Sequence, residues 1–208
     1  MKQWKSASDF VAALARSRLD NVFNPYSDHC PTHDLADGPM IRRNNLELFL
    51  QAALSEGVDD VWVGLELGRQ GGRRTGLPLT DEEHLPAVAQ YWKIPGVRRA
   101  TSGRLAKEPT ASFVWKAVRS TERRILFWNA FPLQCHQPNG TTNRNHSLEE
   151  AQLFQPHLRW VVEQAAPTRI VALGLKAQSA LARAGLTSSY VRHPARNGGP
   201  TFLANIHG

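Results

Sequence analysis

Apolar residues recur at helical spacing in two segments near the start of the chain. The first segment runs from about residue 7 to 18 and stops before Asn24 and Pro25, because a proline and the residue in front of it disfavour helix. A polar, glycine-containing loop follows to about Pro39. The second segment then continues to Gly57, a residue type that commonly ends helices. We therefore predict two helices before the first strand.

Four short apolar runs alternate with helical segments in the rest of the chain. They span Val61–Leu65, Ile125–Trp128, Arg169–Leu173 and Tyr190–Arg192. Short continuous apolar runs are typical of strands buried on both faces of a parallel sheet. Strands alternating with helices predict an α/β fold, here a three-layer αβα sandwich around a short, mainly parallel four-stranded sheet. A ligand site is expected at the carboxyl ends of its strands.

The segments between these strands contain two helices and two loops. We expect one helix that Thr110 or Ser112 caps, and another from about Ser147 to Ala165. Two stretches have loop composition: the glycine- and arginine-rich residues 68–76 and the polar residues 134–146.

The length of 208 residues suits one domain with its own hydrophobic core. We expect a single domain over residues 1–208, in which an N-terminal helical part (1–57) precedes a catalytic core (58–199). Two cysteines are too few to frame a disulfide scaffold, a four-cysteine zinc site or an iron–sulfur cluster. No stretch approaches the ~18 apolar residues of a membrane span. We therefore expect a soluble, cytoplasmic monomer.

The charge balance favours a polyanionic partner. The chain has 25 Lys and Arg against 18 Asp and Glu, which gives a formal net charge of +7. Such a balance is typical of proteins that bind nucleic acid, although a soluble basic protein without that partner has it too.

Three polar clusters follow the apolar strands and narrow the class of nucleic-acid-binding protein that the positive charge suggests. They read G-L-E-L-G at 64–68, W-N-A-F-P at 128–132 and H-P-A-R-N at 193–197, and R-R-T-G stands at 73–76. In order and context, these segments resemble the motifs of the uracil-DNA glycosylase superfamily: an acidic water-activating loop, a strand-end asparagine and a closing His-Pro loop. The resemblance spans roughly residues 61–199 and is closest to bacterial glycosylase-like members without iron–sulfur cysteines.

The resemblance implies an enzyme that flips uracil out of DNA and hydrolyses its N-glycosidic bond, with no cofactor and no metal. This reaction develops positive charge on the sugar and negative charge on the departing base. Glu66 is the candidate that stabilises the sugar and orients a water, and His193 is the candidate donor to the uracil oxygen. A solvated or capping acid and a structural histidine before a proline turn are the alternatives for these two residues.

Three further residues are candidates for contact with the base. Asn129 carries a carboxamide, whose one acceptor and two donors match N3–H and O4 of uracil, whereas cytosine presents the reverse pattern. Leu79 stands where a phenylalanine usually stacks on the extracted base in the superfamily. Gly68 stands where the strictest uracil enzymes have a tyrosine that excludes the thymine methyl group. A strand-ending turn is the alternative reading of Asn129.

The candidate DNA-binding residues lie in basic or polar loops and at one helix start. Arg196 or Asn197 would act as the wedge that fills the place of the flipped base, and Thr110 and Ser112 suit a phosphate at a helix N-terminus, although capping alone also explains them. The full set is Arg69, Arg73, Arg74, Thr110, Ser112, Asn143, Arg144, Arg196 and Asn197. The expected partner is uracil-containing DNA, double- or single-stranded.

Other readings stay open at this point. Gly68 would also suit a glycosylase for other damaged or mismatched bases, such as thymine or hypoxanthine. The acid arrangement at Glu66 and the aliphatic Leu79 would suit a DNA-binding descendant that has lost the reaction. An unrelated nucleotide-binding protein is disfavoured, because the chain has neither a G-x-x-x-x-G-K-[ST] loop nor a G-x-G-x-x-G turn.

Overall fold

The computed structural model describes residues 4–138, 140 and 142–207. Its central sheet contains β2 (Asp60–Glu66), β3 (Ile125–Phe131), β5 (Arg169–Leu173) and β6 (Ser189–Val191). The strands lie in the order β3-β2-β5-β6, and all three neighbouring pairs are parallel. The predicted α/β fold with a parallel four-stranded sheet is confirmed.

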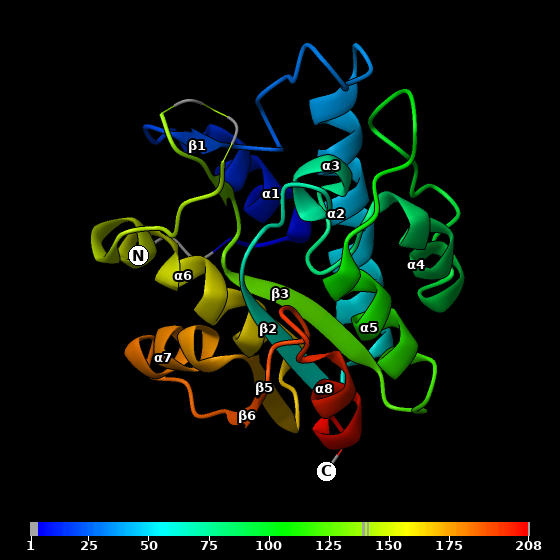
Figure 1. The fold of residues 1–208 in the computed structure, drawn as a ribbon, viewed down its shortest axis with the longest axis vertical. Coiled ribbons are helices and arrows are strands. Elements are labelled where there is room, and N and C mark those ends of the chain that lie inside the picture. The colour runs from blue at the N-terminus through cyan, green and yellow to red at the C-terminus, as the bar shows by residue number, and fades with distance from the viewer. Residues whose placement is uncertain (1–3, 139, 141, 208) are drawn as a thin grey trace.

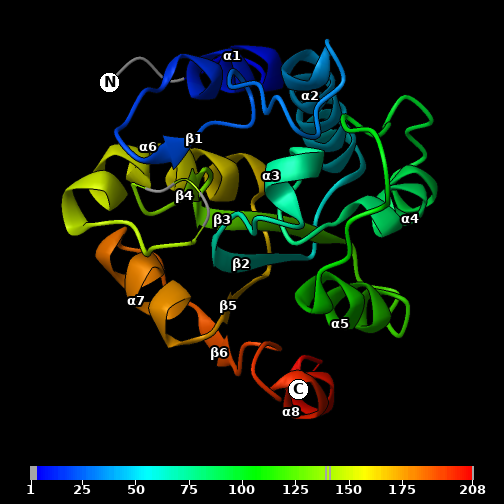
Figure 2. The ribbon, with the colours of Figure 1, turned by 45° about the horizontal axis from the view of Figure 1, so that its top comes forward.

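Helices cover both faces of this sheet (Figures 1 and 2), with α6 and α7 on one side and α5 and α8 on the other. β1 and β4, which are far apart in the chain, form a separate two-stranded antiparallel sheet. The remaining elements are α1 (Ala7–Arg16), β1 (Val22–Phe23), α2 (Gly38–Glu56), α3 (Gly72–Thr75), η1 (Glu82–His84), α4 (Leu85–Tyr91), α5 (Pro109–Val118), β4 (Gln134–Cys135), α6 (Leu148–Ala165), α7 (Leu175–Arg183) and α8 (Gly199–Asn205).

The N-terminal helix is held to the rest of the core by aromatic packing. Ser6 caps α1 by accepting a hydrogen bond from the Asp9 backbone N–H at 3.1 Å, which satisfies one of the free donors of the first turn. Phe10 is fully buried and stacks on Trp160 of α6 with ring centroids 4.4 Å apart. Burying a phenylalanine contributes about 2–3 kcal/mol, so this contact fixes α1 against α6.

Two expected boundaries were wrong, and both affect the site. Strand β3 continues to Phe131 rather than ending at Trp128, so Asn129 lies inside the strand. Helix α5 begins at Pro109 with Glu108 as its N-cap, rather than being capped by Thr110 or Ser112. Proline favours the first helical position because its fixed φ fits and its missing N–H has no partner there.

The two stretches expected as loops contain short regular elements. Within residues 68–76 the chain forms α3, a single helical turn that ends at Gly76 with φ +74°. The polar stretch from Gln134 to His146 begins with β4, which pairs with β1; residues 139 and 141 of this stretch lie outside the described residues. Among the described residues, no helix is long and apolar enough to cross a bilayer.

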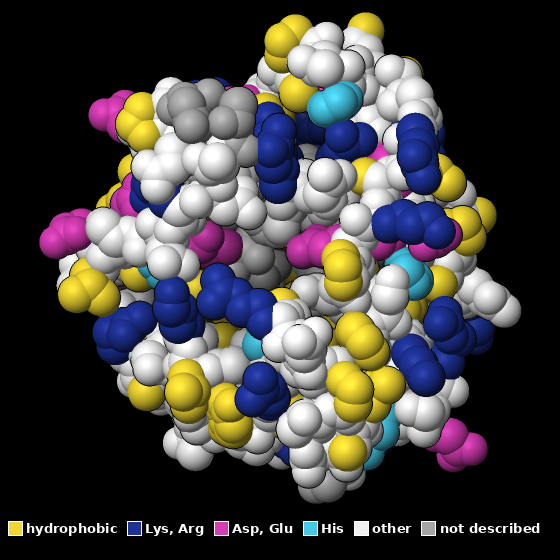
Figure 3. Space-filling model, viewed as in Figure 1, with side chains coloured by type: hydrophobic (Ala, Val, Ile, Leu, Met, Phe, Trp, Pro, Cys, Tyr) yellow, Lys and Arg dark blue, Asp and Glu magenta, His cyan; other side chains and the backbone are white. Residues whose placement is uncertain are grey.

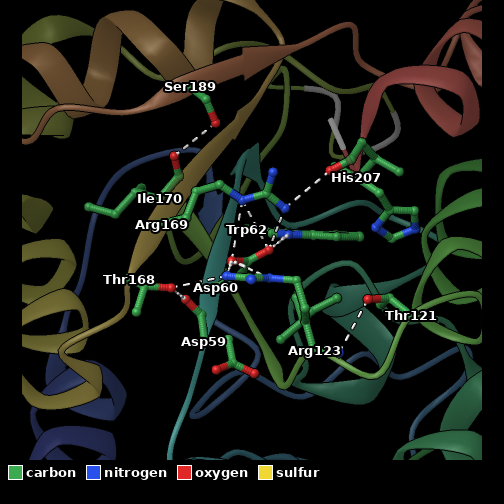
Figure 4. A network of polar contacts seen from close by, with 12 residues as sticks. Asp59, Asp60, Trp62, Thr121, Arg123, Thr168, Arg169, Ile170, Ser189 and His207 are labelled. Atoms are coloured by element: carbon green, nitrogen blue, oxygen red, sulfur yellow. Dashed lines mark hydrogen bonds and ion pairs between the residues drawn. The ribbon is translucent and has the colours of Figure 1, made fainter.

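A buried ion-pair network joins the amino ends of three strands (Figure 4). The Asp60 carboxylate at the start of β2 accepts hydrogen bonds from Arg123 at 2.5 Å and from Arg169 at 2.6 Å. The Trp62 indole N–H lies 3.3 Å from the same carboxylate. Burial would raise the pKa of Asp60, but the hydrogen bonds from Arg169 and Arg123 outweigh it and hold the pKa below its ordinary value. This network closes the end of the sheet opposite the polar clusters.

Candidate functional site

Asn129 and the backbone of Glu66 meet at the carboxyl edge of the sheet. Asn129 is directly opposite Gly64 in the β2–β3 register, and its side chain is fully buried. Its Nδ2 donates to the Glu66 carbonyl oxygen at 3.0 Å. A Cβ atom at Gly64 would lie 2.7 Å from this nitrogen, so glycine is what allows the amide to reach Glu66.

The other end of the same amide has no partner. Asn129 Oδ1 is buried and accepts no hydrogen bond from any described residue. An unsatisfied buried acceptor costs about 1–3 kcal/mol. A ligand that brings an N–H group to this oxygen would remove that cost.

The Glu66 side chain is fixed through one of its two oxygens. Oε1 accepts hydrogen bonds from the backbone N–H and from Nδ1 of His146, both at 2.7 Å. The His146 ring stacks on Phe131 with centroids 4.9 Å apart, so its plane is also fixed. Oε2 has no hydrogen-bond partner among the described residues, and the side chain is 15% exposed. Glu66 can therefore orient a water molecule through Oε2.

His146 is a site residue that the sequence analysis missed. It lies 80 positions from Glu66 in the chain. It stands in the polar stretch just before Ser147, which caps α6. No spacing rule joins a strand end to a loop so far away.

His193 follows β6 in a half-buried position. Its Nδ1 accepts a hydrogen bond from the Ala195 backbone N–H at 3.1 Å, so in the neutral ring the proton is on Nε2. Burial lowers the pKa of His193 below its ordinary 6.5, which keeps the ring neutral near pH 7. Gly174, at the end of β5, makes room for it, because a Cβ atom there would lie 3.1 Å from the His193 Cβ. The arrangement presents a neutral N–H donor.

The Leu79 and Asn129 side chains both approach Gly64, and the role of Leu79 in base contact stays a prediction. The Leu79 Cδ2 atom is 3.0 Å from the position that a Cβ atom at Gly64 would take. Its φ of +51° is unusual for a branched residue and is retained only where the surroundings enforce it. The Thr75 hydroxyl helps to hold the backbone around Leu79, because it donates a hydrogen bond to the carbonyl of the next residue, Thr80, at 2.9 Å.

Gly68 faces a carboxyl group that the sequence analysis also missed. A Cβ atom at Gly68 or at Gly71 would collide with the carboxyl oxygens of Glu108. The Glu108 backbone N–H donates to Asp81 Oδ2 at 2.7 Å. Burial and then the charge of Asp81 raise the pKa of Glu108 to about 7. The place beside Gly68 is thus filled by an acid that titrates near neutrality.

The arginines that follow Gly68 gather on one face of the molecule. Figure 3 shows Lys and Arg side chains over α3 and the neighbouring loops, above and to the right of a central hollow. The Arg73 guanidinium lies 4.1 Å from the centroid of the Phe23 ring. Arg74 pairs with Glu82 at 3.6 Å. Arg69, Arg73 and Arg74 line a common cavity of about 330 Å³.

The remaining candidate DNA-binding residues differ in how free they are. Arg196 and Asn197 are exposed, with φ of +52° and +62°, in the loop after His193. Arg144, by contrast, makes two hydrogen bonds to Glu150, at 2.7 and 2.6 Å. The Asn143 side-chain oxygen accepts from Gln134 at 3.0 Å.

The two residues of the α5 start also differ from each other. Thr110 is buried in the first turn of the helix, whereas Ser112 is exposed. Neither side chain caps the helix. Only Ser112 therefore presents its side chain to solvent.

Comparisons with known proteins give a similar fold but no similar sequence. No protein-family model matches the chain, and no curated protein sequence matches it significantly. The crystal structure of wild-type SMUG2 from Pedobacter heparinus superposes with a TM-score of 0.64 at 17% sequence identity. The match covers 98% of this chain and 97% of that one. The two proteins share one fold over their whole lengths.

Proposed function

We propose that this chain, which has the fold of a uracil-DNA glycosylase superfamily member, is a DNA glycosylase that hydrolyses the N-glycosidic bond of uracil in DNA. One observation carries the proposal. The buried Asn129 amide donates a hydrogen bond to the Glu66 carbonyl, and its own oxygen, Oδ1, has no partner. The Glu66 carboxylate next to it can orient a water molecule. The match to SMUG2 supports the fold on which this geometry depends.

The chemistry follows from two groups at one edge of the sheet. As the C1′–N1 bond breaks, its electron pair leaves with the base, and the Nε2–H of His193 donates to the base oxygen that gains charge. The Glu66 carboxylate stabilises the positive sugar and orients a water, whose oxygen bonds to C1′. One water proton passes to the carboxylate and then, through solvent, to the departed base anion, so that the products are the free base and an abasic site. Each group stabilises charge that is absent from the ground state.

Base selection rests on the Asn129 amide. In this proposal the unpartnered Oδ1 accepts N3–H of uracil, and the second hydrogen of Nδ2 donates to O4. Cytosine has no N3–H, so it would leave Oδ1 unsatisfied at a cost of about 1–3 kcal/mol, or roughly 10- to 100-fold in rate. The Glu108 carboxyl, and not an aromatic ring, stands beside Gly68, so the range of bases is left to measurement with a base panel.

The direct test is release of free base from DNA. Purified protein, with a chelator and no added metal, is expected to release uracil from an oligonucleotide and leave an abasic site that alkali cleaves. A panel with thymine, hypoxanthine and cytosine in duplex and single-stranded DNA measures the base range. Release of another base but not uracil would overturn the uracil assignment. Release of no base would favour a DNA-binding descendant without activity.

A second test concerns the base-reading amide. Asn129→Asp is expected to slow uracil release and to raise the relative rate on cytosine, because a carboxyl group changes the order of donors and acceptors. Asn44→Asp makes the same chemical change at an exposed asparagine of α2 and serves as the control. If Asn129→Asp and Asn129→Ala keep the wild-type rate and selectivity, Asn129 does not read the base.

A further inference from the structure

Two adjoining cavities form a groove beside the candidate site. The first has a volume of about 330 Å³ and the second about 530 Å³. Both are lined by Thr32, His33, Gln70 and Arg74, so they are continuous. The groove begins at Arg69 and Gln70, directly after Gly68. It therefore lies close in the chain to Glu66, but it is not lined by the groups proposed for the chemistry.

One wall of the groove is held in place by a buried arginine. Arg42 is fully buried, and its Nε donates to the Pro25 carbonyl at 2.5 Å. Its two terminal nitrogens donate to the two carboxylate oxygens of Asp34, at 2.9 and 2.7 Å. One of them also donates to the Asp28 carbonyl at 2.9 Å. Bidentate pairs fix geometry as well as charge, so the segment that carries His33 is rigidly built.

The R-R-T-G motif contributes to the same construction. Gly76 has φ +74°, and a Cβ atom there would lie 2.7 Å from the Arg42 Cβ. Glycine is thus needed both for the backbone and for the close approach of Arg42. The motif packs its glycine on the buried arginine and places Arg73 and Arg74 in the cavity lining.

The other wall is joined to the first by backbone contacts. The His33 carbonyl accepts a hydrogen bond from the Ser102 backbone N–H at 2.8 Å, and Asp34 forms a β-bridge with Thr101. These contacts place the 102–107 loop along the groove, where Arg104 and Lys107 line the second cavity with exposed side chains.

The charges that face the groove are mostly positive. Arg69, Arg73 and Arg74 line the first cavity and Arg104 and Lys107 the second. Two of these cations have acidic partners outside the lining: Arg74 pairs with Glu82 at 3.6 Å and Lys107 with Glu83 at 2.6 Å. Asp34 is the acid in the lining of the first cavity, and Arg42 neutralises it. The pKa of His33 is lowered by burial and then by Arg74 and Arg73, against an opposing effect of Asp34 that is larger than the lowering by Arg69. A ligand with negative charge would offset this repulsion.

We propose that this groove binds the phosphate groups of a DNA strand next to the flipped nucleotide, with Arg73, Arg74 and His33 around one phosphate and Arg104 and Lys107 along the strand. The identity of the strand rests on the proposed function, but the groove is separate from the catalytic groups. Arginine forks and ammonium groups on rigid walls are suited to backbone phosphates and carry no sequence information. The groove would thus give affinity without base selectivity.

The titration of His33 tests occupancy directly. NMR measures the pKa of the His33 ring in the free protein, with inorganic phosphate, and with a single-stranded oligonucleotide that lacks uracil. We expect the oligonucleotide to raise the pKa of His33. Inorganic phosphate, at the same concentration of phosphate groups, should leave that pKa unchanged. Equal effects of the two would indicate a site for free anions and overturn the strand assignment. No effect of either would overturn the groove as a phosphate site.

Salt dependence tests the second wall. Arg104→Gln and Lys107→Gln should each weaken binding of the same oligonucleotide and reduce the slope of log K against log salt by about 0.7 per lost contact. Lys116→Gln, which removes an exposed charge outside both cavities, should leave both quantities unchanged. If both groove variants bind with the affinity and salt slope of the wild type, Arg104 and Lys107 do not contact the strand, and this part of the proposal is wrong. Base release by the wild-type protein is measured in parallel, so that failure of the glycosylase proposal is recognised separately.

Discussion

At the scale of single residues, the two proposed catalytic groups are held in different ways. The Glu66 carboxylate is fixed through Oε1 by two hydrogen bonds from His146, which leaves Oε2 for water. The His193 ring is fixed by one hydrogen bond from a backbone N–H to Nδ1, which leaves Nε2–H for the base. Each group thus keeps one atom for the substrate, and preorganisation of this kind is most effective as charge develops.

Substitution of either group should therefore affect chemistry more than binding. Glu66→Gln and His193→Ala are each expected to lower the single-turnover rate of uracil release by ~100-fold or more. Affinity for uracil-containing DNA should change far less, because phosphate contacts supply most of it. Glu149→Gln, at an exposed acid in the first turn of α6, is the control. Near-normal turnover in Glu66→Gln with loss in His193→Ala would place the acid elsewhere.

Glu108 should make stability depend on pH near neutrality. Its folded-state pKa is about 7 against an ordinary 4.5, so the folded protein binds this proton more tightly than the unfolded chain does. Its contribution is full below pH 4.5 and is lost as pH rises through 7. Urea unfolding should show that the wild type loses stability relative to Glu108→Gln between pH 5 and pH 8. Glu83→Gln, at an exposed acid, should follow the wild type; parallel curves for wild type and Glu108→Gln would contradict the raised pKa.

The residues that the sequence predicted and those it missed differ in one physical respect. Glu66, Asn129 and His193 stand at or near the ends of apolar strands, and a parallel sheet brings such ends to one edge. His146 and Glu108 reach the site from loops through side-chain contacts. Such contacts depend on the path of each loop, which hydrophobic periodicity does not describe.

At the scale of elements, the start of α6 links the helix to the site. Ser147 accepts from the Glu150 backbone N–H at 3.2 Å, and Glu150 accepts from the Ser147 backbone N–H at 2.6 Å. Glu150 also pairs with Arg144, which donates to the Asp20 carbonyl at 3.1 Å. This arrangement fixes both sides of His146, the residue that holds Glu66.

Arg144 is therefore expected to stabilise the loop rather than to bind phosphate. Arg144→Gln should lower the free energy of unfolding by about 1 kcal/mol, because the pair is partly exposed. The salt slope of DNA binding should stay within experimental error of the wild type. A slope reduced by about 0.7–0.9, with unchanged stability, would instead support the phosphate contact that the sequence analysis predicted.

The major strands were predicted better than the smaller helices. The run Arg169–Leu173 has the boundaries of β5, and the helix expected over 147–165 is α6 with Ser147 as its cap. Helices α7 and α8 were not foreseen. Both are short and begin after glycine, and α8 also has a proline in its first turn. Glycine and proline are typical of turns, so the local sequence did not indicate helices here. Short helices of this kind form because packing against the rest of the protein stabilises them.

At the scale of the whole molecule, the two ends of the sheet differ in how their polar groups are paired. The carboxyl end carries polar groups with unpartnered atoms, such as Asn129 Oδ1. At the amino end, the Asp60 carboxylate of β2 is paired with Arg169, the first residue of β5, and with Arg123, which lies just before β3. This carboxylate therefore joins the starts of the three strands.

The stability of the sheet should therefore depend strongly on Asp60. Asp60→Asn removes the charge but keeps the shape, and it leaves Arg123 and Arg169 without their shared anion. Asp60 is fully buried, but the Arg123 and Arg169 side chains that remain are 40% and 23% exposed and can be solvated. Hydrogen bonds to charged groups contribute about 1.5–3 kcal/mol, so a fall of that order in the free energy of unfolding is expected. Asp37→Asn, which breaks an exposed pair with Arg98, should cost about 1 kcal/mol or less.

The pH dependence provides the decisive comparison for this network. The pKa of Asp60 is held below its ordinary value of 3.8, so its contribution is present above that pH and is lost as pH falls through the folded-state pKa. Urea unfolding of the wild type should show stability falling steeply in acid, and Asp60→Asn should flatten this fall, because asparagine does not titrate. The variant should also differ most from the wild type at neutral pH and least near pH 2. If the two proteins lose stability in parallel as pH falls, Asp60 does not carry a depressed pKa, and the arginines are balanced by other groups.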